Sequence, residues 1–185
     1  MTQTTVVRKA DWIIAWDADA GGHVYLRGGD VAFTEDRITH VGGHFAGGAD
    51  CEIAGDGLCV MPGLINLHSH PYSSPLNKGF ATNDVAGQLG ERLWVSDFDL
   101  FHKTDSDRRL CASVAYAEML SGGVTTAVDI SYPYEGWLDG AEASGLRLVL
   151  APSFSGGGMG QDDAFGVRYT WKDDGGYGAF ATSLA

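Results

Sequence analysis

The chain has 185 residues, of which 44% are hydrophobic and 19% charged, a composition that suits one sizeable globular domain or two small ones. Its formal net charge of −12 argues against nucleic acid or an anionic membrane as a partner, because both attract basic surfaces. No apolar leader follows a basic start and no run of about 18 apolar residues occurs, so the sequence predicts a cytoplasmic protein.

Residues 1–59 are predicted to form a small β domain, either β-sandwich-like or an open barrel. Short runs rich in β-branched and aromatic residues are separated by Gly-Gly pairs, and no helical period runs through the region. His23, His40 and His44 lie in or beside these runs, and we expect structural or solvated roles because no second ligand sits at a useful spacing. The predicted strands cover residues 4–8, 12–16, 23–27, 30–34, 37–41 and 58–61.

The cysteines are odd in number and have no framework spacing. Cys51, Cys59 and Cys111 are therefore predicted to be free, mostly buried thiols in a reducing compartment. Cys51 and Cys59 also lack the short pairing of a zinc–thiolate site, so we assign them no metal role.

The next segment, Val-Met-Pro-Gly-Leu-Ile-Asn-Leu-His-Ser-His at residues 60–70, predicts a buried strand that ends in two histidines. Side chains alternate along a strand, so His68 and His70 should project from the same face until Pro71 stops the strand. Two neutral imidazoles in this position can hold one divalent cation such as Zn²⁺ or Fe²⁺. A lone His-x-His is a weak signal, and two histidines that merely lie in a strand are the alternative.

Residues 71–103 form a long connection without clear periodicity. Loops of this length often carry binding residues, and the alternative is an ordinary surface loop with a short helix around residues 85–94. We assign Asn77 and Lys78 to substrate binding. The full set of candidates to line a substrate cavity is Pro71, Tyr72, Pro75, Asn77, Lys78, Asn83 and Asp84.

A helix is predicted over residues 104–121. Thr104 or Asp105 can cap its start, and the Gly-Gly pair at residues 122–123 ends it. Apolar residues at helical spacing predict one stripe that faces the core. That stripe consists of Leu110, Val114, Ala117 and Leu120.

The remainder predicts strands over residues 124–131 and 146–154, with a short helix between them at residues 134–144. A glycine-rich turn and tail follow, with the start of a helix near residues 177–184. This strand–helix order is α/β and predicts the first three βα units of a (β/α)8 TIM-type barrel. Asp129 is interpreted as a helix-capping or solvent-facing residue, the alternative being a hydrogen bond to a metal-bound histidine.

Two motifs in this part of the chain resemble the amidohydrolase superfamily. Residues 62–70 match the Pro-Gly-apolar-apolar-Asn/Asp-x-His-x-His pattern of its first barrel strand, through Pro62, Gly63, Leu64, Ile65, Asn66, His68 and His70. Residues 119–129 resemble its Leu-x-x-Gly-Val-Thr-Thr segment, in which the first helix runs into the second strand. The resemblance implies that residues 1–59 belong to an accessory β domain and residues 60–185 to a hydrolase barrel, both incomplete.

The resemblance also implies an activity. His68 and His70 would hold a catalytic divalent metal, and activated water would hydrolyse C–N bonds other than peptide bonds in a small-molecule substrate. The His-Ser-His motif and the long loop look most like the branch of cytosine, guanine and adenosylhomocysteine deaminases and triazine chlorohydrolases. The alternatives are a dihydroorotase- or hydantoinase-like cyclic amidase, a triazine chlorohydrolase, or a non-catalytic fragment derived from a barrel.

A complete barrel needs about 250 residues, more than residues 60–185 supply. The family's other ligands and its proton-transfer residue come from later strands: a histidine on the fifth, a histidine on the sixth and an aspartate on the eighth, with a bridging lysine on the fourth in some members. We therefore expect the chain to be the N-terminal portion of a longer enzyme, inactive alone, and the full-length protein to be a homo-oligomer.

Overall fold

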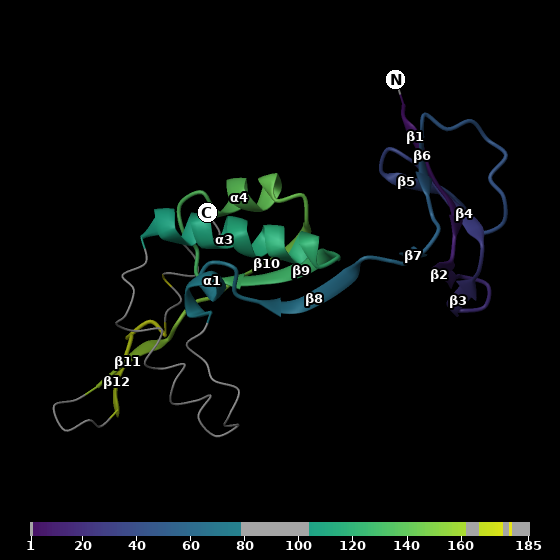
Figure 1. Cartoon of the computed structure of the whole chain (residues 1–185). Helices are drawn as coiled ribbons and strands as arrows, with labels where there is room; N and C mark the ends of the chain where they lie inside the picture. The colour runs from purple at the N-terminus through teal and green to yellow at the C-terminus, as the bar shows by residue number, and fades with distance from the viewer. Residues whose placement is uncertain (1, 79–103, 162–166, 176–177, 179–185) are drawn as a thin grey trace. The chain divides into compact units, whose positions relative to one another are not determined.

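The structure, a computed structural model, describes residues 2–78, 104–161, 167–175 and 178 (Figure 1). The chain forms two compact units, Met1–Pro62 and Gly63–Ala185. The helices predicted around residues 85–94 and 177–184 lie outside the described residues, apart from residue 178, as do Asn83 and Asp84.

The first unit is built from strands alone. They are β1 (Thr4–Ala10), β2 (Trp12–Asp17), β3 (Gly22–Leu26), β4 (Gly29–Thr34), β5 (Arg37–Val41), β6 (Cys51–Ala54) and β7 (Cys59–Val60). One sheet has the order β5-β4-β1-β6 and the other the order β3-β2-β7. Val7, Ala10 and Val31 of the first sheet form a single core with Ile13 of the second. The six predicted strands are all present.

Strand β6 was not predicted, and the prediction of mostly buried cysteines was wrong. β6 has only four residues, all of them exposed, and so short a strand gives little periodic signal. Cys51 in β6 and Cys59 in β7 are exposed, whereas Cys111 is buried. None of the three cysteines forms a disulfide, as predicted.

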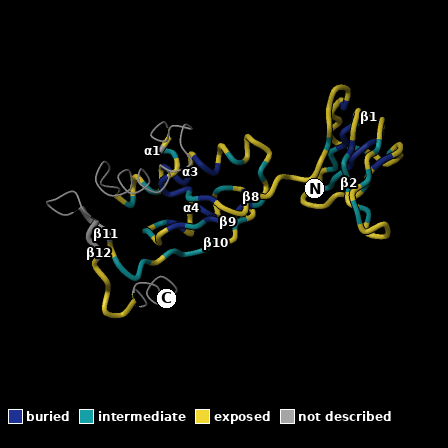
Figure 2. The backbone as a smooth tube through the Cα atoms, turned by 90° about the horizontal axis from the view of Figure 1, so that it is seen from below, coloured by how far each residue is buried: buried dark blue, intermediate teal, exposed yellow. Residues whose placement is uncertain are grey.

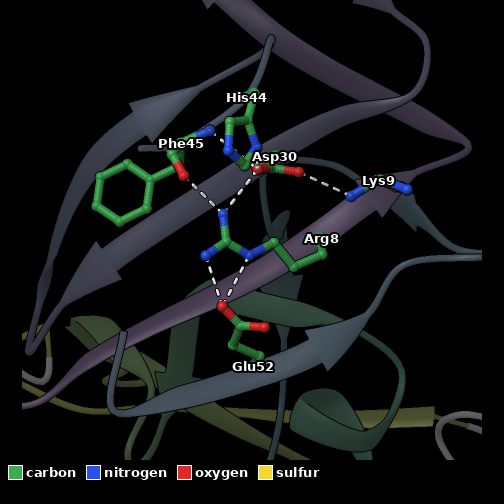
Figure 3. Close-up of polar contacts among 6 residues, drawn as sticks. All are labelled: Arg8, Lys9, Asp30, His44, Phe45 and Glu52. Atoms are coloured by element: carbon green, nitrogen blue, oxygen red, sulfur yellow. Dashed lines mark hydrogen bonds and ion pairs between the residues drawn. The ribbon is translucent and has the colours of Figure 1, made fainter. Parts of the chain in front are cut away.

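A buried aspartate joins β1, β4 and the segment after β5 (Figure 3). Asp30 is 1% exposed, and its Oδ1 accepts from the backbone N–H of Lys9 at 2.9 Å. Its Oδ2 accepts from the backbone N–H of Phe45 at 2.9 Å and from Arg8 Nη1 at 2.9 Å. His44 Nδ1 lies 3.2 Å from the same oxygen. One carboxylate therefore fixes three separate segments of this unit.

The second unit contains a parallel sheet with helices on one face (Figure 1). In chain order its elements are β8 (Leu64–Ser69), α1 (Ser74–Asn77), α3 (Asp105–Ser121), β9 (Val124–Ser131), α4 (Trp137–Ala143), β10 (Arg147–Pro152), β11 (Gly157–Gln161) and β12 (Val167–Trp171). The sheet order is β10-β9-β8, with β9 at the centre. The predicted order of strand, helix, strand, helix and strand is confirmed, but the prediction of a buried first strand was wrong. Leu64, Ile65 and Leu67 of β8 are 49%, 64% and 74% exposed.

The C-terminal part of the second unit differs from the prediction. β11 and β12 pair as an antiparallel hairpin where the sequence predicted a glycine-rich turn and loop. Its first strand contains three glycines among five residues, a composition that is depleted in strands and masks their signal.

Helix α3 begins as predicted but buries a different face (Figure 2). Thr104 forms a capping box with Asp107: the Thr104 hydroxyl accepts from the Asp107 backbone N–H, and the Asp107 carboxylate accepts from the Thr104 backbone N–H. The predicted stripe was wrong, because Leu110, Val114 and Leu120 are exposed. The buried residues are Cys111, Ala112, Ala115 and Tyr116. None of the helices in the described ranges is long and apolar enough to cross a membrane.

Candidate metal centre

His68 and His70 lie side by side at the carboxyl end of β8. Their Nε2 atoms are 3.1 Å apart and their rings meet edge to face. The predicted convergence of the two imidazoles is therefore confirmed. His68 is exposed and His70 is half-buried, so the pair is open to solvent on the His68 side.

A hydrogen bond to the neighbouring strand defines the tautomer of His70. Its Nδ1 lies 2.8 Å from the backbone carbonyl oxygen of Ile130 in β9. A carbonyl oxygen can only accept, so Nδ1 carries the hydrogen and Nε2 of the neutral ring presents a lone pair. This is the arrangement of a metal-binding histidine whose other ring nitrogen is held by a carbonyl group.

The backbone around His70 is also held firmly. Ser69 is 9% exposed, and its Oγ donates to the carbonyl oxygen of Val128 at 2.6 Å. The carbonyl oxygen of His70 accepts from the backbone N–H of Ser74 at 2.9 Å and from that of Ser73 at 3.2 Å. Pro71 follows His70 and is fully buried. The strand end and the turn into α1 thus leave the His70 side chain little freedom.

The pair fits a divalent cation. Zn–N bonds of about 2.0–2.1 Å in a tetrahedral shell place two ligand nitrogens about 3.3 Å apart, and the observed separation of the Nε2 atoms is 3.1 Å. No third histidine, cysteine or carboxylate joins the pair among the residues that the structure describes. Two nitrogens are half of a four-coordinate shell.

The other predicted site residues lie at α1, just before it and just after it. Lys78 Nζ forms an ion pair with Glu118 of α3, so this ammonium group is already engaged. Asn77 is the last residue of α1, and its side chain lies outside what the structure describes. Tyr72 is buried and meets the His70 ring edge to face at a centroid distance of 6.4 Å. Among the described contacts, that of Lys78 is with Glu118 and not with the histidine pair.

Asp129 is neither a helix cap nor a solvent-facing residue, so the favoured interpretation was wrong. It is 0% exposed, and its Oδ2 accepts from Tyr116 Oη at 2.5 Å and from Trp137 Nε1 at 2.8 Å. Its Oδ1 accepts from Ser131 Oγ. Burial and the hydrogen bond to this carboxylate raise the pKa of Tyr116, which therefore stays a donor. The sequence signal that was missed is an acid within an apolar central strand, because such a position requires partners.

Sequence comparisons relate the chain to nucleoside deaminases. It is 30% identical over 147 residues to a 5'-deoxyadenosine deaminase of Methanosarcina mazei, covering 79% of this chain and 32% of the relative. It is 30% identical over 159 residues to a 5-methylthioadenosine/S-adenosylhomocysteine deaminase of Haloarcula marismortui, covering 85% of this chain and 31% of the relative. The chain thus spans about a third of the length of these curated relatives. No family model matches it.

Solved structures establish the fold. A triazine hydrolase from Arthrobacter aurescens superposes with a TM-score of 0.67 at 21% identity, over 88% of this chain and 39% of that one. An atrazine chlorohydrolase from Arthrobacter aurescens, complexed with zinc, superposes with a TM-score of 0.63 at 24% identity, over 87% and 39% of the two chains. The parallel βα arrangement of the second unit is thus a fold that these hydrolases share over part of their length. These likenesses agree with the resemblance to the amidohydrolase superfamily that residues 62–70 and 119–129 carry.

Proposed function

We propose that this chain carries the first two metal ligands of a metal-dependent hydrolase that deaminates a heterocyclic or nucleoside-like amine. The observation that carries the proposal is the convergence of two Nε2 atoms at 3.1 Å, with the His70 ring fixed by the Ile130 carbonyl group. Two relatives at 30% identity bear the names of adenosine-derivative deaminases, which supports deamination over the other reactions of this fold.

In this proposal His68 and His70 hold the cation, which is Zn²⁺ or Fe²⁺. When bound, such a cation activates water for attack on the carbon that carries the amino group. The chain's own residues prepare the site. Ile130 keeps the His70 Nε2 lone pair available, and Ser69 fixes the backbone between the two rings. Asn77 and Lys78 remain proposed substrate contacts, and Lys78 must leave Glu118 to act as one.

The test is the metal content of the protein expressed at full length. Replacing His68→Asn and His70→Asn together should abolish bound zinc, because the proposal gives these rings half of the ligand shell. Zinc is measured by elemental analysis after loading and desalting. His23→Asn is the matched control, since His23 packs against Trp16 in the first unit and should leave the zinc content unchanged. Full zinc occupancy in the double variant would refute the metal role.

The 185-residue chain alone is expected to gain little from zinc. Two imidazoles leave the shell half-filled, so binding is weak and millimolar zinc should raise the Tm by less than about 3 °C. Thermal unfolding with and without zinc measures this, with the His68→Asn/His70→Asn variant as the baseline. If zinc raised the Tm by about 10 °C or more, other residues would have to complete the metal site.

A further inference from the structure

The buried carboxylate of Asp129 joins β9 to both helices that cover the sheet. Tyr116 reaches it from α3 and Trp137 from α4, at 2.5 Å and 2.8 Å, and both donate to Oδ2. Ser131 donates to Oδ1 from two residues further along β9. A carboxylate that is 0% exposed and accepts three hydrogen bonds has little freedom to move. The backbone of β9 on either side of Asp129 is thereby fixed against α3 and α4.

The same stretch of β9 holds the strand that carries the histidine pair. The carbonyl group before Asp129, that of Val128, accepts from Ser69 Oγ at 2.6 Å. The carbonyl group after it, that of Ile130, accepts from His70 Nδ1 at 2.8 Å. The β8–β9 register is irregular between Asn66 and Ser69, and Ser69 pairs with Asp129. Side-chain hydrogen bonds to the two carbonyl groups that flank Asp129 thus hold β8 where its regular ladder ends.

We propose that Asp129 is a positioning residue for the metal ligand His70, acting through the Ile130 carbonyl group. Asp129 does not touch the histidine ring. It holds the backbone segment whose carbonyl oxygen selects the His70 tautomer and keeps the His70 Nε2 beside that of His68. The inference rests on the proposed function in one respect, the metal role of His70, whereas the effect on the ring is independent of that role.

The experiment measures the tautomer of the His70 imidazole directly, in the 185-residue chain. Nitrogen-15 NMR of histidine-labelled protein distinguishes Nδ1–H from Nε2–H rings, and the His70→Asn variant assigns the signal. In the wild type we expect His70 to be protonated at Nδ1. Asp129→Asn removes the charge and puts an amide NH₂ group in place of one carboxylate oxygen, so the hold on β9 is weakened and His70 should become a mixture of tautomers. Zinc affinity should fall by about tenfold, the lower range for residues that orient a ligand.

Three further variants keep the test decisive. Tyr116→Phe and Trp137→Phe each remove one donor and should shift the tautomer in the same direction by less, so the test stands even if Asp129→Asn does not fold. Ala115→Gly is the control, because glycine destabilises the buried face of α3 without removing a donor to Asp129. It should leave the His70 signal unchanged.

The proposal is overturned if the folded Asp129, Tyr116 and Trp137 variants all keep the wild-type His70 signal. It is overturned equally if Ala115→Gly shifts that signal as far as they do, since loss of stability alone would then suffice. Failure of the proposed function is a separate result. If the wild-type full-length protein binds no zinc, the metal role of His70 is refuted, while the NMR comparison still shows whether Asp129 positions the ring.

Discussion

Replacing Asp30 by alanine should lower the free energy of unfolding of the Met1–Pro62 unit by about 3–5 kcal/mol, the range for removing one partner from a buried charge pair. The substitution leaves the backbone N–H groups of Lys9 and Phe45 without their acceptor, and it removes a carboxylate from the Arg8 guanidinium. Figure 3 shows how these donors converge on the single carboxylate. Chemical denaturation followed through the amide NMR signals of β1 and β4 measures the change.

Glu52→Gln is the matched control because Glu52 is the other acid bound to Arg8. Its side chain is 56% exposed, against 2% for Asp30. Exposed ion pairs contribute about 0–1 kcal/mol, so the control should lose no more than that. Equal losses in the two variants would contradict the argument, because burial of the Asp30 carboxylate would then make no difference.

The same carboxylate makes the unit sensitive to acid. Burial alone would raise the pKa of Asp30, but the hydrogen bonds from Lys9, Phe45, Arg8 and His44 outweigh it and hold the pKa well below its usual value. A pKa lowered by folding adds stability that is present above the unfolded value of about 3.9 and is lost as the pH falls below it. Wild-type protein should therefore lose stability below about pH 4, whereas Asp30→Asn should show a flatter pH dependence.

The sequence predicted the parts of the fold that repeat a simple pattern. The alternation of β8 placed His68 and His70 on one face, and the Thr104 cap placed the start of α3. Apolar spacing failed on α3 because which face of a helix is buried depends on its neighbours. The small side chains of Ala112 and Ala115 are buried, and Leu110 is left 66% exposed.

The partners of the two buried aspartates could not have been predicted from the sequence. Asp30 and Asp129 each lie in a strand, where a charged residue usually marks the exposed face. What makes them buried is a set of donors from distant segments. Tyr116 and Trp137 reach Asp129 from 13 and 8 residues away, and Phe45 reaches Asp30 from 15 residues away. Such convergence is a property of the fold and leaves no local periodicity.

Gly63 precedes β8, and the structure gives a reason for the glycine of the Pro-Gly motif. We expect Gly63→Ala to lower the free energy of unfolding of the second unit by about 3 kcal/mol, the upper part of the range for overpacking. A Cβ on Gly63 would lie 2.6 Å from the Cβ of Thr125 in β9, and closer still to its Oγ1 and Cγ2. The φ of Gly63 lies outside the left-handed region, so the requirement is one of space. Gly140→Ala is the control, since nothing lies within 4 Å of the added Cβ and alanine suits helix α4.

A second substitution tests this explanation against a general loss of strand stability. Thr125→Gly removes all three atoms that the new Cβ would meet, so the double variant Gly63→Ala/Thr125→Gly should recover about 2 kcal/mol relative to the sum of the single changes. The backbone N–H of Leu64 donates to the carbonyl oxygen of Gly123 at 2.8 Å, so β8 and β9 are already in register at this point. Denaturation of the four proteins measures the coupling. Strictly additive losses would show that Gly63 is needed for some other reason than the close approach of Thr125.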